Sequence, residues 1–390
     1  MEVGPLSGLR VVDFTHILAG PYCTQFLADA GATVIKVEPP GGEHSRARGA
    51  LRRTPAGTVS SYYAAVNRGK QSVVLDLRTA EGRAAASRLI ESASIVVENF
   101  APGTIARLGF DLAELRRRDP RLVTVSISLF GDAASAGPLA SRTGLAIVAE
   151  GESTVASMTR HPDGTPVTPG IPIGDMATGL AAYAAIVTAL IERSRTGRGR
   201  HLDISMVRTL WALNSAAAVR AQLKDAGPGT SDRPAGYGVF PAADGYVTIG
   251  VNSNRIFGRL AAAIGRPDLT EDHRYSDAAG RDQAAGEINA IVAGWTRQRT
   301  VAVVVETLSA SDVPSGRVMT PEGLLADEDL RAAGFVETNP DGFGGTIDTP
   351  ANPLGYSRPG AAIPRLGEHA GEVLSGTAQT QSMQLPSAPM

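Results

Sequence analysis

The first 130 residues alternate regularly between short apolar runs and segments with helical patterns. Apolar runs rich in β-branched residues are typical of buried strands, and they cover residues 9–14, 33–38, 72–77, 95–97 and 122–128. Helical patterns separate them, including one at about 80–92 that Thr79 would cap and a shorter one running from Pro21 to Gly31. Because strand–helix–strand units place parallel strands in one sheet with right-handed crossovers, the alternation predicts an α/β domain with a doubly wound, Rossmann-like parallel sheet.

A domain of this kind could bind a dinucleotide, with Glu38 at the end of the second strand as the ribose ligand. The turn after the first strand argues against it. That turn reads His16-Ile-Leu-Ala-Gly20-Pro21 and lacks the G-x-G-x-x-G pattern that lets the backbone approach a pyrophosphate. A nicotinamide cofactor is therefore not expected.

The second half of the chain changes character twice. Linker residues around 226–236 precede a predicted hairpin, whose turn at Ala242–Gly245 joins residues 238–240 to 246–250. Helical patterns follow near 254–264, 282–298, 301–309 and 322–333. We therefore expect a large α/β domain at 1–222, a linker and small α+β domain at 226–334, an extended Pro- and Gly-rich return at 335–376 that completes the large domain, and a disordered tail at 377–390.

Composition excludes several classes of partner. The net charge of −2 gives no electrostatic footprint for nucleic acid or for a membrane surface. The longest apolar run, Leu180–Ile191, is shorter than the roughly 20 residues that span a bilayer. The single cysteine, Cys23, excludes an intrachain disulfide and fits a buried packing residue. With no signal-peptide pattern at the N-terminus and no metal-ligand spacing among six scattered histidines, we expect a cytoplasmic protein that uses no metal.

One acidic residue stands where the sequence passes from a predicted strand end into a long apolar helix. The segment reads Ile171-Pro-Ile-Gly174-Asp175, and the helix continues to about Arg195. An aspartate there can cap the helix, because its carboxylate accepts a backbone N–H of the first turn. It can also be a nucleophile, kept ionised by the helix N-terminus and exposed at the strand end. The residues alone leave both interpretations open.

Three segments, in this order and spacing, resemble one family. They are residues 9–21 running into 31–42, residues 67–77 with 97–103 and 107–109, and the segment around Asp175. Together they resemble the class III coenzyme A transferases, the CaiB/BaiF family, which includes formyl-CoA transferase and acyl-CoA racemases. The resemblance is close over about residues 6–215 and looser beyond.

The resemblance implies an enzyme that uses CoA as a substrate and holds no permanent cofactor. In that family the aspartate attacks an acyl-CoA thioester, forms a mixed anhydride, and then carries CoA as an aspartyl thioester until an acceptor carboxylate takes over the acyl position. Asp175 matches that aspartate. Succinyl-CoA is a common donor among such enzymes. The family also implies an interlocked homodimer, and we expect the return from Phe335 to lie on the partner, because ordering it alone costs about 1–2 kcal/mol per residue.

Alignment with the family implies a set of CoA-binding positions at strand ends. Arg78 and Arg107 would bind phosphates, where a guanidinium fits well. The full set is His16, Leu18, Leu75, Asp76, Leu77, Arg78, Asn99, Phe100, Ala101, Arg107, Thr143, Gly144, Leu145 and Ala146.

The chain also departs from the family at positions that bear on the substrate. Leu18 replaces a glutamine of the formyl-CoA transferases, and Leu145-Ala146 replace a Tyr-Glu pair. These changes argue against formyl or oxalate transfer and favour a bulkier or branched acyl group. A 2-methylacyl-CoA racemase needs a histidine base after Gly137–Ala140, but Arg142–Leu145 contains none. A CoA transferase is therefore the leading hypothesis, with a racemase and a non-catalytic CoA-binding protein as alternatives.

Overall fold

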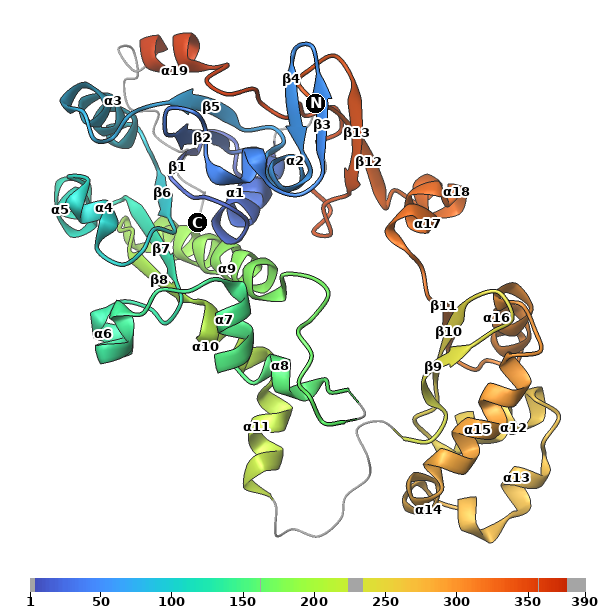
Figure 1. The fold of residues 1–390 in the computed structure, drawn as a ribbon. Helices are drawn as coiled ribbons and strands as arrows, with labels where there is room; N and C mark the ends of the chain where they lie inside the picture. The colour runs from blue at the N-terminus through green and yellow to red at the C-terminus, as the bar shows by residue number, and fades with distance from the viewer. Residues whose placement is uncertain (1–3, 162, 224–233, 357, 377–390) are drawn as a thin grey trace. The chain divides into compact units, whose positions relative to one another are not determined.

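The computed structural model describes residues 4–376 except 162, 224–233 and 357. The chain forms two compact units, one made of Met1–Ala218 with Asp329–Met390 and the other of Val219–Glu328. Most of the predicted linker and the whole predicted tail at 377–390 lie outside the described residues. Each unit is described by itself (Figure 1).

The large unit is built on a six-stranded sheet whose neighbouring strands are all parallel. Its strands are β1 (Arg10–Asp13), β2 (Thr33–Glu38), β5 (Gln71–Val74), β6 (Ile95–Glu98), β7 (Val123–Ser128) and β8 (His201–Ser205). They lie in the order β5-β2-β1-β6-β7-β8, which is the doubly wound order with a switch point between β1 and β6. The predicted α/β fold is therefore confirmed, although strand β8 was not predicted.

Helices cover both faces of this sheet (Figure 1). One face packs on α1 (Ala19–Asp29), α9 (Ile173–Thr196) and α10 (Met206–Leu213), and the other on α3 (Ala80–Glu91), α5 (Leu112–Arg118) and α19 (Ala370–Gly376). Val11 and Val12 are fully buried in opposite cores, because successive side chains of a strand point to opposite faces. Burial on both faces explains why these strands read as continuous apolar runs.

Helix starts follow local capping chemistry only in part. Thr79 caps α3 as predicted, since its hydroxyl accepts the Gly82 N–H at 3.0 Å. Helix α1 begins at Ala19, two residues before the predicted start at Pro21. Cys23 is fully buried in this helix, as predicted.

Helix α9 is longer than the apolar run that the sequence analysis counted. Within the described residues it alone has the length and hydropathy of a membrane span, with an 18-residue window of mean hydropathy 1.5 and 33% of that window buried. It packs against α1, α7, α10, β7 and β8. A single such helix is weak evidence for a span, because the core helices of soluble proteins share these properties.

The return segment of the large unit is not simply extended chain. It forms an antiparallel hairpin, β12 (Val336–Pro340) and β13 (Thr346–Pro350), and then helix α19. It also lies on its own chain: the Asn352 amide donates to Asp29 at 2.9 Å, and the His369 N–H donates to the Ser72 carbonyl at 3.0 Å. The segment therefore makes stabilising contacts within its own chain, and its contact with a partner stays a prediction.

The remaining elements of the large unit are short. They are a hairpin of β3 (Leu51–Thr54) and β4 (Gly57–Ser60), the 3₁₀ turns His44–Ala47 and Gly137–Ser141, and the helices α2 (Ser61–Asn67), α4 (Thr104–Arg107), α6 (Ala133–Ala136), α7 (Ala146–Glu152), α8 (Val155–Met158) and α18 (Glu328–Ala332). Helix α11 (Ser215–Gln222) contains the boundary between the two units at Ala218.

The small unit is a three-stranded antiparallel sheet with helices on one face. Strands β9 (Tyr237–Pro241) and β10 (Tyr246–Gly250) form the predicted hairpin, and β11 (Ser315–Arg317) pairs with β10. The helices are α12 (Asn254–Ala263), α13 (Asp268–Glu271), α14 (Ala278–Gln283), α15 (Ala285–Thr296), α16 (Val301–Ala310) and α17 (Pro321–Ala326), with a 3₁₀ turn at His273–Tyr275. The helix predicted over 322–333 is interrupted, because Asp327 adopts an extended conformation between α17 and α18.

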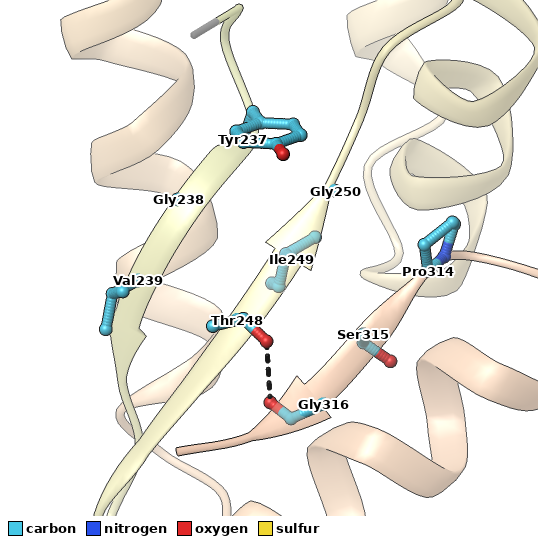
Figure 2. Close-up of a pocket in the computed structure, with 9 residues that line it drawn as sticks. All are labelled: Tyr237, Gly238, Val239, Thr248, Ile249, Gly250, Pro314, Ser315 and Gly316. Carbon is cyan, nitrogen blue, oxygen red and sulfur yellow. Dashed lines mark hydrogen bonds between the residues drawn. The ribbon is translucent and has the colours of Figure 1, made fainter. Parts of the chain in front are cut away.

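The open face of the small sheet is hollowed. Figure 2 shows Tyr237, Thr248 and Pro314 around this hollow, with the Thr248 hydroxyl donating to the Gly316 carbonyl at 3.2 Å. Its volume is about 590 Å³.

Candidate active site

The candidate site is a cavity of about 190 Å³ at the carboxyl ends of β1, β6 and β7. It lies at the switch point between β1 and β6, where open parallel sheets bind their ligands. It is lined by His16, Ile17, Ala19, Asn99, Phe100, Ala101, Pro102, Ile127, Ser128, Leu129, Arg142, Thr143, Gly144, Leu145, Asp175 and Met206. The larger hollow of the small unit has no carboxylate, histidine, cysteine, lysine or arginine in its described lining, where Tyr237 is the one titratable side chain.

The structure brings together eight of the predicted site residues: His16, Asn99, Phe100, Ala101, Thr143, Gly144, Leu145 and Asp175. The other predicted residues, Leu18, Leu75, Asp76, Leu77, Arg78, Arg107 and Ala146, do not line the cavity. Sequence reasoning missed Ile127, Ser128 and Leu129 at the carboxyl end of strand β7, and it also missed Ile17, Ala19, Pro102, Arg142 and Met206. The strand-end rule applied to β7 could have found the first three.

Asp175 is the third residue of α9. It accepts a hydrogen bond from the backbone N–H of Ala19 in α1. The two helices approach closely at Gly179, where a Cβ would lie 2.6 Å from the Ala19 carbonyl oxygen. No strand directly precedes Asp175, and the N-cap position is Pro172, so the expected strand end and the capping role are both wrong.

The environment raises the pKa of Asp175 to about 6. Burial is the largest cause, and the negative charge of Glu150 adds to it, while the Ala19 N–H acts in the opposite direction. The sequence analysis expected the helix N-terminus to keep this carboxylate ionised. Desolvation outweighs that effect, so Asp175 is mainly ionised at neutral pH by a margin of only about one pH unit.

Glu150 joins α7 to the start of α9. Its side chain is 4% exposed, and its Oε1 accepts the N–H of Gly174 at 3.2 Å. Gly174 also packs closely on Ala146, since a Cβ on Gly174 would lie 3.0 Å from the Ala146 Cα. Ala146 therefore serves the packing of Asp175 in this structure.

The loops after β1 and β6 are fastened to each other by one side chain. The His16 N–H donates to Asn99 Oδ1 at 2.8 Å, and Asn99 Nδ2 donates to the His16 carbonyl at 2.9 Å. Phe100 meets the His16 ring edge-on, with centroids 5.3 Å apart. Burial, followed by the nearby charge of Lys36, lowers the pKa of His16, so its ring is neutral at pH 7.

A buried ionic network supports the loop after β1. Lys70 Nζ lies 3.1 Å from Asp13 Oδ2, and Lys36 Nζ donates to the Thr15 carbonyl at 2.8 Å. Burial alone would raise the pKa of Asp13, but these two lysines hold it well below its usual range. The network therefore stays charged and fixes the backbone that leads to His16.

Glu38 has structural partners that leave no ribose-binding role. Its carboxylate accepts Arg46 Nε at 2.6 Å and the Ser72 hydroxyl at 2.7 Å, and the side chain is fully buried. This arrangement agrees with the absence of a dinucleotide fingerprint in the sequence.

The two arginines predicted for phosphate binding are exposed near the rim of the sheet. Arg78 donates to both carboxylate oxygens of Asp76, each at 2.8 Å, and Arg107 donates to the Thr104 hydroxyl at 2.6 Å. Their contact with a phosphate stays a prediction.

Residues 6–370 match the family model described as CoA-transferase family III. This chain belongs to that family. It is 34% identical to the succinate–glutarate CoA-transferase of Agrobacterium fabrum, over 95% of both chains. It is 35% identical to the succinyl-CoA–D-citramalate CoA-transferase of Chloroflexus aurantiacus, over 83% of this chain and 80% of that one. The structure of a CaiB/BaiF family protein from Brucella suis is similar with a TM-score of 0.84 and 31% identity, covering 96% of this chain and 100% of that one. The predicted family and the enzyme class are confirmed.

Proposed function

We propose that this CoA transferase moves CoA from succinyl-CoA to a carboxylic acid through covalent intermediates on Asp175. The observation that carries the proposal is the position of Asp175, a single carboxylate facing a cavity at the switch point of the sheet. Two relatives named for succinate or succinyl-CoA support the choice of donor.

The proposed reaction alternates between anhydride and thioester. The Asp175 carboxylate attacks the thioester carbonyl and expels the CoA thiolate, which leaves an acyl–aspartyl anhydride. The thiolate then attacks the aspartyl carbonyl, releases succinate and forms an aspartyl–CoA thioester. The acceptor carboxylate attacks that thioester and expels CoA, whose thiolate takes the new acyl group and frees Asp175. Each step exchanges one acyl bond for another of similar reactivity, so no net proton is needed.

The environment of Asp175 suits such a nucleophile. A carboxylate with a raised pKa is more basic than an exposed one, and it is still mainly ionised near pH 7. The Ala19 N–H, which now binds the carboxylate, would face the oxygen on which negative charge develops when the aspartyl carbonyl is attacked.

Mass spectrometry of the enzyme quenched after mixing with succinyl-CoA tests the proposal. We expect a CoA adduct on the peptide that contains Asp175, and no adduct and no transfer in Asp175→Ala. Asp163→Ala, which changes an exposed loop aspartate, is the matched control. Retention of more than a few per cent of turnover by Asp175→Ala would refute the assignment. Scrambling of a chiral 2-methylacyl-CoA without transfer would favour a racemase, and neither activity a CoA-binding protein.

CoA itself is proposed to bind along the carboxyl ends of the strands, with Arg78 and Arg107 on its phosphates. Each change to Ala should weaken CoA binding by about tenfold or more, the effect of one charged hydrogen bond. Titration calorimetry measures this, with Arg118→Ala as an exposed control on α5. Unchanged affinity in both variants would make these arginines surface charges.

We further propose that the enzyme works in the cytoplasm as a homodimer. Support comes from large apolar side chains left exposed on the large unit, among them Ile191, Trp211 and Leu213, which are 51%, 45% and 65% exposed.

A further inference from the structure

Arg142 brings a permanent positive charge to the active-site cavity. Within the described lining, the basic side chains are His16 and Arg142. The His16 ring is neutral at pH 7, because burial lowers its pKa. Arg142 therefore supplies the permanent positive charge in the described lining of the cavity that Asp175 also lines.

The Arg142 guanidinium is held in place by contacts that use only part of its hydrogen-bond donors. Its Nη2 donates to Glu152 Oε1 at 2.5 Å, and its carbon lies 4.8 Å from the centroid of the Phe130 ring. An arginine has five N–H donors, and the structure gives its side chain one hydrogen bond among the described residues. The Arg142 side chain is 45% exposed, so the remaining donors can reach a ligand.

The ion pair between Arg142 and Glu152 contributes little to the free energy of folding. Glu152 is 40% exposed, and exposed pairs of this kind contribute about 0–1 kcal/mol to folding. What the pair and the aromatic ring do provide is orientation, since they restrict the rotamers of a long side chain before any ligand arrives.

Much of the described lining that Arg142 and Asp175 share is apolar. The cavity lining includes Ile17, Phe100, Ile127, Leu129, Leu145 and Met206, whose side chains suit methylene groups. An acyl group bound there would have its carbonyl at Asp175 and its carbon chain on these side chains. The sequence analysis expected a bulkier or branched acyl group from Leu18, Leu145 and Ala146, but it did not consider Arg142 as a ligand for that group.

We propose that Arg142 binds the distal carboxylate of a dicarboxylic acyl group and makes the enzyme select dicarboxylic over monocarboxylic substrates. This inference rests on the proposed function, since it needs Asp175 to be the reacting group. A guanidinium can bind a carboxylate through two parallel hydrogen bonds, whereas a methyl group in the same place gains nothing from it.

A phosphate of CoA is the other source of an anion for Arg142. The same donors would bind it, but it is present in every acyl-CoA, whatever the acyl chain. A phosphate contact would therefore weaken all acyl-CoA substrates and free CoA equally, whereas a carboxylate contact acts on dicarboxylic substrates alone.

The test compares succinyl-CoA with butyryl-CoA, two four-carbon donors that differ in ending with a carboxylate or a methyl group. We expect Arg142→Gln to lower the ratio of their kcat/KM values by about tenfold to a hundredfold. Arg200→Gln is the matched control, because it removes an exposed ion pair with Glu192 away from the cavity, and it should leave the ratio at the parent value.

Glu152→Gln separates binding from structural support. It breaks the same ion pair but keeps the positive charge, so the succinyl preference should persist or increase. Loss of the preference in Glu152→Gln to the extent seen in Arg142→Gln would overturn the proposal, as would a ratio within twofold of the parent in Arg142→Gln. An equal fall for both donors, with weaker binding of free CoA by calorimetry, would assign Arg142 to a phosphate and also overturn it. Failure of the proposed function is distinguishable, since transfer would then survive in Asp175→Ala with either donor.

Discussion

Replacing Asp175 with asparagine, its neutral isostere, should make the protein more stable. The pKa of Asp175 in the folded chain is about 6, compared with an ordinary value of 3.8. The folded state therefore binds this proton more tightly than the unfolded state, and ionisation costs stability as the pH rises between the two values. Each pKa unit corresponds to about 1.4 kcal/mol, so the full cost above pH 7 is about 3 kcal/mol as an upper limit.

Asp175→Asn removes this cost while keeping an oxygen that can accept the Ala19 N–H. We expect the free energy of unfolding at pH 8 to rise by about 2–3 kcal/mol. The gain should fall below about 1 kcal/mol at pH 4, where the carboxyl is protonated in the folded state and about two-fifths protonated in the unfolded state. The same variant should lose CoA transfer. One substitution would then raise stability and remove activity.

Urea unfolding at fixed protein concentration measures the difference, because subunit association would otherwise shift the result. Asp329→Asn, at an exposed position in α18, is the control and should leave stability unchanged. An asparagine variant no more stable than the parent at pH 8, or a gain that is the same at pH 4 and pH 8, would contradict the prediction.

Three further predictions follow from the same contacts. Glu150→Gln removes a negative charge beside Asp175 and should move the acidic limb of the kcat/KM profile from about pH 6 to lower pH; an unmoved or rising limb would contradict this. Gly179→Ala should destabilise the chain by about 1–3 kcal/mol and reduce transfer, because its Cβ forces α9 away from α1. The control is Gly286→Ala, which adds a Cβ in open space on α15 and should be neutral or stabilising in thermal melts. Sedimentation over a wide dilution range should show a dimer, and a folded, active monomer at nanomolar concentration would count against it.

The sheet could be predicted because its strands are buried on both faces. Strands β1, β2, β6 and β7 consist largely of Val and Ile and have no strong competing pattern. Strand β8 reads His201-Leu-Asp-Ile-Ser205 and lies at the edge of the sheet, where burial is partial. Its polar residues hid it from the apolar-run criterion.

The return segment contains a hairpin signal that the prediction of extended chain did not take into account. The turn between β12 and β13 contains Asp341-Gly342, a dipeptide typical of hairpins. The surrounding Pro and Gly residues suggested extended chain, and the alternation in Val336–Pro340 was too short to outweigh them.

The candidate site was predictable where it follows motifs and strand ends, as for Asp175, His16 and Asn99. Its electrostatics were not. The local rule for a carboxylate in the first turn of a helix favours ionisation, but burial in the folded chain reverses the sign of the pKa shift. Glu150, from 25 residues earlier in the chain, adds to this effect through a tertiary contact. Arg142 was missed for the same reason, since its orientation depends on Glu152 and Phe130.

The clamp between Asn99 and His16 has a mechanical consequence. One amide group uses both its oxygen and its nitrogen on a single backbone unit of the neighbouring loop. Separating the loops breaks both hydrogen bonds together, at a cost of about 1–3 kcal/mol. The loops after β1 and β6, which both line the cavity, are thus held together by one side chain, through one of its two N–H donors and one lone pair of its oxygen. An aspartate at position 99 could still accept the His16 N–H, but it could not donate to the His16 carbonyl.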